Sequence, residues 1–102
     1  MSVQYSSASA QSAPEPNAVD DTVAARFFVT ADADPGIVPR LVEPFSKMGI
    51  VPTRIHVSSE DGDGSEFSAD LRASGITRET AHLIDKALRR IIGVRQVIAV
   101  NE

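Results

Sequence analysis

Hydrophobic and polar residues alternate in four short stretches of this sequence, at residues 25–30, 51–58, 65–73 and 94–100. A period of two places successive side chains on opposite faces of an extended chain, so each stretch is predicted to be a β-strand. In the first stretch Ala25, Phe27 and Val29 alternate with Arg26, Phe28 and Thr30. In the second stretch one face is formed by Val51, Thr53, Ile55 and Val57, and the other by Pro52, Arg54, His56 and Ser58. In the third stretch one face is formed by Phe67, Ala69 and Leu71, and the other by Glu66, Ser68, Asp70 and Arg72.

Two further segments repeat hydrophobic residues every three or four positions, which predicts helices over residues 37–48 and 77–92. The apolar stripe of the first is Ile37, Val38, Leu41, Val42, Phe45 and Met48, and that of the second is Ala81, Ile84, Ala87, Leu88, Ile91 and Ile92. The predicted boundaries are N-caps at Asp34 and Thr77 and C-terminal stops at Gly49 and Gly93. Pro35 suits a first helical position, whereas Pro44 lies in a helix interior and is expected to bend it.

These elements follow one another in the order β-α-β-β-α-β, with a hairpin loop expected at residues 60–64. Right-handed crossovers in both β-α-β halves place the two helices on one face of a four-stranded antiparallel sheet. The predicted fold class is therefore α+β, with the ferredoxin-like plait as its architecture. Pro52 near the start of the second strand suits an edge of that sheet, and the face without helices is left open.

Residues 1–24 differ from the rest of the chain, because they are rich in Ser and Ala and carry Glu15, Asp20 and Asp21 without any Lys or Arg. A segment without a periodic apolar face cannot bury enough surface to order itself, so we expect a disordered tail followed by one folded domain at residues 25–102. The tail lacks the basic start and apolar run of a secretory signal. No apolar run approaches the ~20 residues of a membrane span, so a cytoplasmic protein without membrane contacts is expected.

The composition narrows the range of functions. The chain of 102 residues has no cysteine and a net charge of -4. The absence of cysteine excludes a disulfide framework and thiolate chemistry, and we expect no metal and no cofactor. No catalytic motif is present and no catalytic residue is assigned, so a regulatory or binding domain is favoured over an enzyme. Nucleic acid is not an expected partner, because Phe28 on the open face stands opposite Glu66 and Asp70, whose carboxylates repel phosphate.

The turn before the first helix is the candidate ligand site. Its residues are Asp32, Asp34, Pro35, Gly36 and Ile37. Unpaired N–H groups in the first helical turn attract a carboxylate, and the two aspartates could accept hydrogen bonds from a protonated amine. Gly36 allows a close approach because it has no Cβ. An amino acid meets both charge requirements, although a turn that only starts a helix has the same sequence.

The sequence also resembles a known family. The stretches ARFFVT at residues 25–30, DPGIVPRL at 34–41 and FSKMGI at 45–50 are similar to the opening half of an ACT domain, and the resemblance extends over residues 25–100. Within that family the chain looks most like the small regulatory subunits of acetolactate synthase.

The resemblance implies a regulatory domain that binds an amino acid between two copies of the chain. The family's ligand loop falls on Asp32, Asp34, Gly36 and Ile37, and its pairing edge falls on Arg54, Ile55, His56 and Val57. A homodimer through the second strands, a larger catalytic subunit as partner and a branched-chain amino acid as effector are what the resemblance implies. The alternative is a dimerisation or assembly module that binds no ligand and docks on a partner enzyme.

Overall fold

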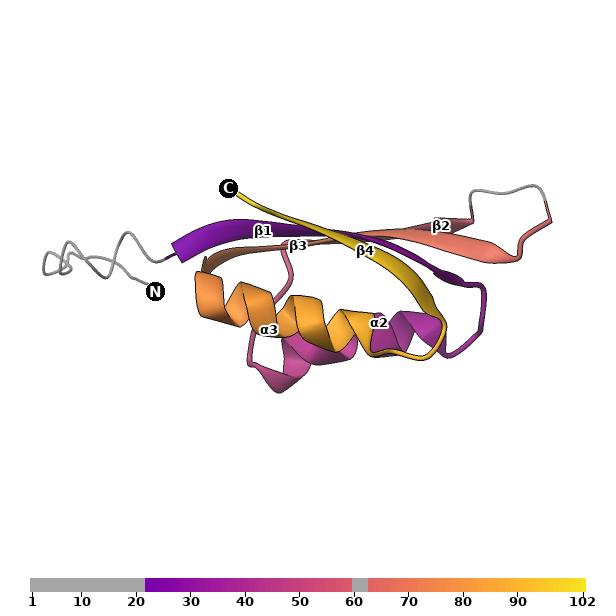
Figure 1. The fold of residues 1–102 in the computed structure, drawn as a ribbon, viewed down its shortest axis with the longest axis horizontal. Helices are drawn as coiled ribbons and strands as arrows, with labels where there is room; N and C mark the ends of the chain where they lie inside the picture. The colour runs from indigo at the N-terminus through magenta and orange to yellow at the C-terminus, as the bar shows by residue number, and fades with distance from the viewer. Residues whose placement is uncertain (1–21, 60–62) are drawn as a thin grey trace, which may run out of the picture.

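The computed structural model of this chain describes residues 22–59 and 63–102, so part of the predicted loop at 60–64 lies outside the described residues. Six elements form in the predicted order and with the predicted types (Figure 1). Their bounds are β1 Thr22–Asp32, α2 Ile37–Lys47, β2 Arg54–Ser59, β3 Glu66–Thr77, α3 Arg78–Arg89 and β4 Val94–Asn101. The predicted ferredoxin-like fold is confirmed.

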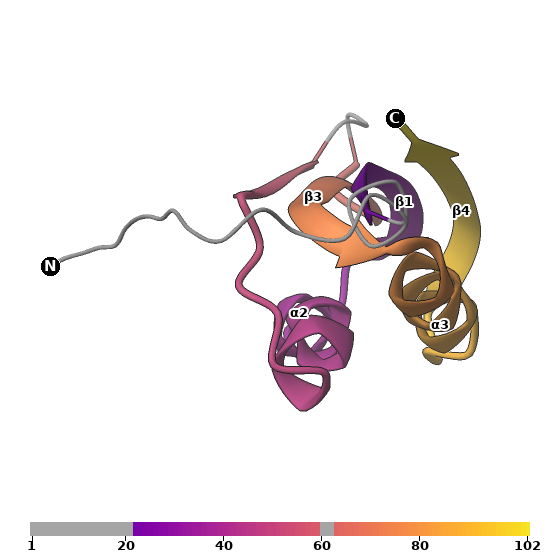
Figure 2. The ribbon, with the colours of Figure 1, turned by 90° about the vertical axis from the view of Figure 1, so that its left-hand side faces the viewer.

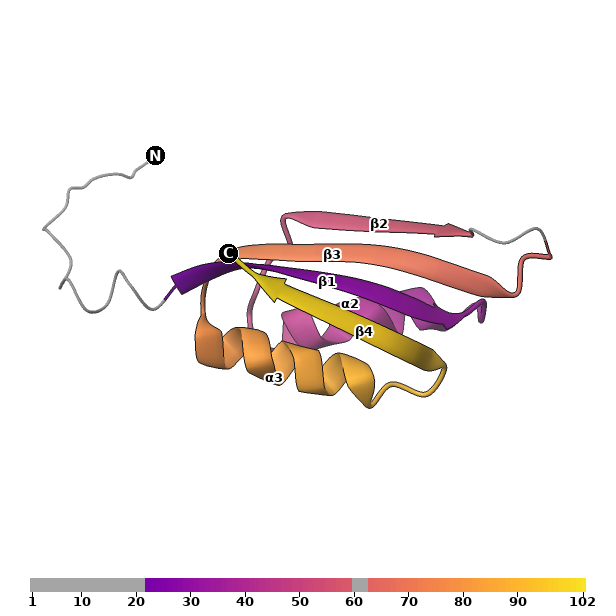
Figure 3. The same ribbon diagram turned by 45° about the horizontal axis from the view of Figure 1, so that its top comes forward.

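The four strands form one antiparallel sheet in the order β2-β3-β1-β4, which places β2 and β4 at its edges (Figure 3). Both helices lie on the same side of the sheet, with α2 toward β2 and α3 toward β4 (Figure 2). The other side of the sheet carries no helix and is called the open face below. Arg26, Phe28 and Thr30 lie on it, as the alternation in the sequence predicted.

The core lies between the sheet and the two helices. Phe27, Leu71, Leu41, Phe45 and Ile84 are fully buried there, so the predicted inward faces of β1, β3 and both helices are confirmed. The rings of Phe27 and Phe45 meet edge to face with centroids 6.0 Å apart, which joins β1 to α2. Edge-to-face packing is favourable for aromatic pairs and adds to the burial of apolar area.

All four strands differ from their predicted bounds, and β4 differs only in extending to Asn101. β1 begins at Thr22, so residues 22–24 belong to the strand and not to the tail, because Val23 is buried opposite Ile76 of the long β3. β3 accordingly extends to Thr77. β2 begins at Arg54, because Pro52 has no N–H to donate to a ladder and Val51 is left 85% exposed.

Both helix ends next to the candidate site also differ from the prediction. The N-cap of α2 is Gly36 and not Asp34, because the Asp34 side chain accepts a hydrogen bond from Gly36 N before the helix begins. The α3 helix ends at Arg89, so Ile92 leaves the predicted apolar stripe and is 87% exposed. The predicted Thr77 cap of α3 is confirmed, with its hydroxyl accepting from Thr80 N at 3.0 Å.

Candidate functional site

Asp34 holds the turn between β1 and α2 in shape. Its Oδ1 accepts a hydrogen bond from Gly36 N at 3.0 Å, and its backbone carbonyl accepts one from Ile37 N at 2.9 Å. Arg40 Nη1 lies 3.4 Å from its Oδ2. The Gly36 hydrogen bond, followed by the charge of Arg40, lowers the pKa of Asp34 below that of an ordinary aspartate. Of the N–H groups at the start of α2, those of Gly36 and Ile37 are therefore bonded to Asp34 itself.

Asp32 belongs to a different set of contacts. Its carboxylate accepts a 2.6 Å hydrogen bond from Arg95 Nε, and the same guanidinium donates through Nη1 to Glu66 at 2.6 Å. Hydrogen bonding to Asp32, followed by the charge of that carboxylate, raises the pKa of Arg95. The structure thus assigns Asp32 to an ion-pair triad that joins β1, β3 and β4, and leaves Asp34 as the acid of the turn beside α2.

The remaining predicted ligand residues have distinct environments. Pro35 is exposed, whereas Ile37 is fully buried and contributes to the core. A side chain at Gly36 would approach Arg40 Nη2 at 3.1 Å, so the absence of a Cβ there allows Arg40 to lie across the turn. The Arg40 side chain therefore lies against Gly36, where the sequence predicted the approach of a ligand.

A cleft of about 480 Å³ opens between the start of α2 and the end of α3. It is lined by Asp34, Arg40, Glu43, Arg90, Ile91 and Ile92. Two guanidinium groups, two carboxylates and two aliphatic side chains therefore surround one space. Of these residues, sequence reasoning named only Asp34 as a ligand contact. Arg40 and Glu43 are three positions apart on α2, a spacing that places them on one helix face, but their convergence with Ile92 depends on where α3 ends.

The predicted pairing residues divide between the two sides of edge strand β2. Ile55 and Val57 stand opposite Leu71 and Ala69 on the helix side, while Arg54 and His56 lie on the open face. Met48, Val51 and Ile55 are exposed apolar residues at this edge of the molecule, at 37%, 85% and 50%. An edge strand also turns alternate N–H and C=O groups away from its sheet, so the β2 edge offers both backbone and apolar contacts.

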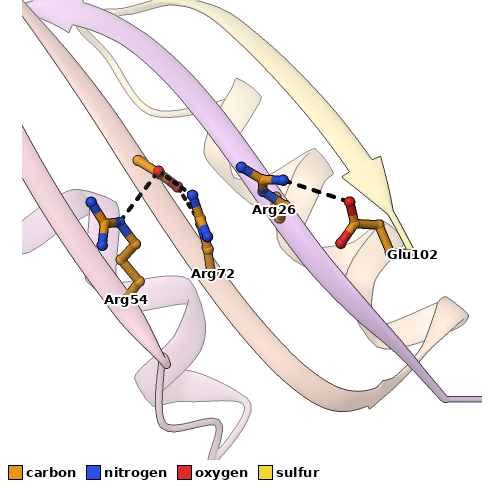
Figure 4. Close-up of polar contacts among 5 residues, drawn as sticks. Arg26, Arg54, Arg72 and Glu102 are labelled. Carbon is orange, nitrogen blue, oxygen red and sulfur yellow. Dashed lines mark hydrogen bonds and ion pairs between the residues drawn. The ribbon is translucent and has the colours of Figure 1, made fainter.

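Three arginines lie side by side across the open face. Arg54 pairs in register with Arg72, and Arg72 pairs with Arg26, so these residues form one row across β2, β3 and β1, called the arginine row below (Figure 4). Asp70 accepts two hydrogen bonds from Arg72, at 3.0 and 2.9 Å, and lies 3.4 Å from Arg54 Nε. The Arg72 hydrogen bonds, more than the charges of the arginines, lower the pKa of Asp70.

A second concavity, of about 300 Å³, adjoins the arginine row on the open face. Across the four strands His56, Asp70, Phe28 and Ile98 stand opposite one another, and all four line it. The Arg26 guanidinium lies 5.2 Å from the centre of the Phe28 ring, a cation–π contact. The open face thus has a concavity of mixed polar and apolar lining beside the arginine row.

Neither a metal-binding cluster nor a membrane-spanning helix is present among the described residues. Within residues 22–59 and 63–102, no group of three or more His, Cys, Asp or Glu side chains is arranged to hold a metal ion. Neither α2 nor α3, the helices of that part of the chain, is long and apolar enough to cross a membrane.

Solved structures share this fold at low sequence identity. The ACT domain of GTP pyrophosphokinase from Chlorobium tepidum superposes with a TM-score of 0.65 at 16% identity, covering 78% of this chain and 99% of that chain. The C-terminal domain of the MgtC protein from Mycobacterium tuberculosis gives 0.57 at 18% identity, covering 81% and 90%. The regulatory subunit of aspartate kinase from Thermus flavus gives 0.55 at 20% identity, covering 78% of this chain and 52% of that one.

The sequence comparison is more specific than the structural likeness. No curated protein sequence matches the chain. A family model for an ACT-like domain matches residues 17–101, which is most of the chain and includes all six elements. The chain therefore belongs to the family of ACT-like domains.

Proposed function

We propose that this ACT-like domain senses a small aliphatic amino acid and works as a regulatory subunit or stand-alone sensor. The observation that carries the proposal is the cleft beside the β1–α2 turn, where opposite charges and aliphatic side chains surround one space. The solved structure of an aspartate kinase regulatory subunit with the same fold supports a regulatory role.

The chemistry of the cleft matches the three parts of such a ligand. Arg40 and Arg90 can receive an α-carboxylate, because guanidinium groups bind carboxylates with paired hydrogen bonds. Asp34 or Glu43 can accept hydrogen bonds from the α-ammonium group. Ile92 is 87% exposed, so contact with an aliphatic side chain of the ligand would remove apolar surface from water and favour binding. A branched-chain amino acid has all three features, and the resemblance to acetolactate synthase small subunits favours the same effector.

A thermal-shift screen of the twenty amino acids tests the proposal. We expect valine, leucine or isoleucine at millimolar concentration to raise Tm and glycine to have little effect, since a ligand that binds only the folded state stabilises it. Arg90→Gln should remove the shift. Lys86→Gln, a charge change on the same helix outside the cleft lining, should preserve it. If no amino acid raises Tm, or if both variants respond like the parent chain, the proposal is wrong.

A pair of chains joined through β2 is the second part of the proposal. Antiparallel or parallel addition at this edge would satisfy the backbone groups of β2 and cover Met48, Val51 and Ile55. A folded part of about 80 residues gains stability from such burial, because small domains bury a limited share of their surface. Ligand binding near α2 would then regulate a larger catalytic subunit by favouring one arrangement of the pair over another.

The alternative is an assembly module that pairs and docks on a partner enzyme without an effector. It is favoured by the contacts of the turn, in which Gly36 N, Ile37 N and both aspartates already have partners within the chain. This alternative predicts a dimer whose Tm and mass do not change with any amino acid. Sedimentation velocity with and without the best ligand of the screen separates the two readings.

A further inference from the structure

The concavity on the open face is formed by two neighbouring rows of side chains, each of which crosses all four strands. The first row is His56, Asp70, Phe28 and Ile98. The second row lies two residues along each strand and is called the polar row below; its members are Ser58, Ser68, Thr30 and Gln96. One side of the concavity therefore carries an aromatic ring and an aliphatic side chain, and the other carries three hydroxyl groups and a primary amide.

The side chains of the polar row have no hydrogen-bond partner in the described part of the chain. Ser58, Ser68 and Thr30 are half-buried, and neither their hydroxyl groups nor the Gln96 amide makes a side-chain hydrogen bond within residues 22–59 and 63–102. Hydroxyl and amide groups can each both donate and accept. A ligand that displaces water from the polar row must replace the lost hydrogen bonds, so it needs donors and acceptors along one edge.

The charges around the concavity are balanced. Among its described lining residues the one carboxylate is Asp70, which accepts two hydrogen bonds from Arg72 and lies 3.4 Å from Arg54 Nε (Figure 4). The ion pairs of the whole open face join four arginines to four carboxylates, namely Arg26, Arg54, Arg72 and Arg95 to Asp70, Glu102, Asp32 and Glu66. An ionised ligand would be desolvated here without meeting an unbalanced opposite charge, so the concavity favours an uncharged one.

Phe28 gives the concavity a flat apolar surface. Its ring is half-buried and lies 5.2 Å from the Arg26 guanidinium, measured to the ring centre. Ile98 stands opposite Phe28 on β4 and is 51% exposed, which extends the apolar surface. Planar heterocycles stack on aromatic side chains through their π-faces. The volume of about 300 Å³ is at the lower end of the range for ligand sites, so the ligand is small.

We propose that this concavity is a second ligand site and that it binds an uncharged, planar heteroaromatic molecule of the nucleobase or nucleoside class. The heterocycle stacks on Phe28, and its polar edge exchanges hydrogen bonds with the polar row. The site lies on the face without helices, so it is separate from the cleft between α2 and α3 and does not depend on amino-acid binding. A nucleic-acid strand is disfavoured, because Asp32 and Glu66 lie one row, about 7 Å, beyond the polar row.

Amide NMR of the isotope-labelled full chain tests the proposal, with adenosine as the probe. We expect millimolar adenosine to shift the signals of Phe28, Thr30 and Ser68 and to leave those of Arg40 and Ile92, in the α2–α3 cleft, unchanged. Adenosine 5′-monophosphate should bind with similar affinity, because the face has no unbalanced positive charge. Ribose, which lacks the ring system, and phenylalanine, which is a zwitterion without a polar ring edge, should leave the open-face signals unchanged. Leucine should not displace adenosine.

Three variants assign the contacts. Phe28→Leu keeps an apolar side chain but removes the ring, and it should weaken adenosine binding about fivefold or more, the effect of losing one base–aromatic stack. Ser68→Ala removes one hydroxyl group of the polar row and should also weaken binding. Ser74→Ala is the matched control, because Ser74 lies on the same strand outside the lining, and this variant should bind like the parent chain.

Four results would overturn the proposal. The first is that adenosine shifts no signal on the open face. The second is that ribose or phenylalanine produces the same shifts, which would show that a heteroaromatic ring is not what the concavity recognises. The third is that the monophosphate binds much more tightly than adenosine, which would make the arginine row an anion site. The fourth is that Phe28→Leu and Ser68→Ala both titrate like Ser74→Ala.

Discussion

Arg95 and Asp32 are joined by a 2.6 Å hydrogen bond between Nε and Oδ1, 63 positions apart in the sequence. The bond fixes the end of β1 to β4 immediately before the turn that leads into α2. It also engages one of the two aspartates in the candidate ligand loop. Asp34, two positions later, lines the cleft and is the acid available to a bound ammonium group.

Asp34→Asn is therefore expected to weaken amino-acid binding and Asp32→Asn to leave it nearly unchanged. An asparagine at position 34 still offers an oxygen to Gly36 N, so the turn is retained while the negative charge is lost. We expect a loss of affinity on the order of tenfold, the effect of one charge-assisted hydrogen bond. Isothermal titration of both variants measures it. Equal losses in the two variants would contradict the assignment of Asp34 to the cleft.

Phe27 and Phe28 are neighbours in the sequence on opposite sides of the sheet, and they should differ sharply in their contribution to stability. Phe27 is fully buried against Phe45, so Phe27→Ala should lower the free energy of unfolding by about 3–5 kcal/mol. Phe28 lies half-buried on the open face, and Phe28→Ala should cost less. Denaturant unfolding of both variants provides the comparison. A larger loss for Phe28→Ala would mean that the open face is the better-packed side.

The fold was predictable because its signals are local. The alternation of Phe27, Phe28 and Val29 identified a strand with two unlike faces, and the Thr77 cap identified the start of α3. Such patterns set the order of elements, and the order then limits the sheet to few topologies. The ends of β1 and β2 were harder to predict, because they depend on how far β3 extends as a pairing partner.

The contacts of the candidate site were less predictable, because they join distant segments. Arg95 is far from Asp32 in the sequence, and nothing near either residue indicates the pair. Arg90 and Ile92 reach the cleft only because α3 ends at Arg89 and the chain then turns. The arginine row required the exact register of β1, β2 and β3, since a shift of one residue would turn its side chains to the other face.

Gly93 is expected to tolerate substitution less well than Gly64, although both have positive φ. Gly93 has φ of +100°, and a Cβ there would meet Ile37 Cδ1 at 3.2 Å in the core. At Gly64 φ is +70° and a Cβ meets nothing within 4 Å. Gly64→Ala should cost about 1 kcal/mol for the backbone conformation alone, and Gly93→Ala should cost more. Thermal unfolding of the two variants tests this order, and equal Tm values would contradict it.

The Asp70 ion pairs should make the folded state sensitive to acid. Hydrogen bonds from Arg72 lower the pKa of Asp70 in the folded state relative to the unfolded chain. A carboxylate of this kind contributes stability that is fully present above about pH 4 and is lost as pH falls through the lower folded value. Asp70→Asn should therefore reduce stability at pH 7 and show a shallower decline between pH 4 and pH 2 than the parent chain. Parallel declines would show that other carboxylates govern the acid sensitivity.

The β2 edge and the α3–β4 connection each expose an isoleucine, and only one of them should affect association. Ile55 is 50% exposed on edge strand β2, and a lysine there places charge in the proposed pairing surface. Ile92 is 87% exposed beyond the end of α3, away from that edge. Sedimentation velocity at micromolar concentration should therefore report a dimer for the parent chain and for Ile92→Lys, and a monomer for Ile55→Lys. If Ile92→Lys alone dissociates the pair, the chains associate through the helix side near α3, and if the parent chain is a monomer, pairing through β2 is wrong.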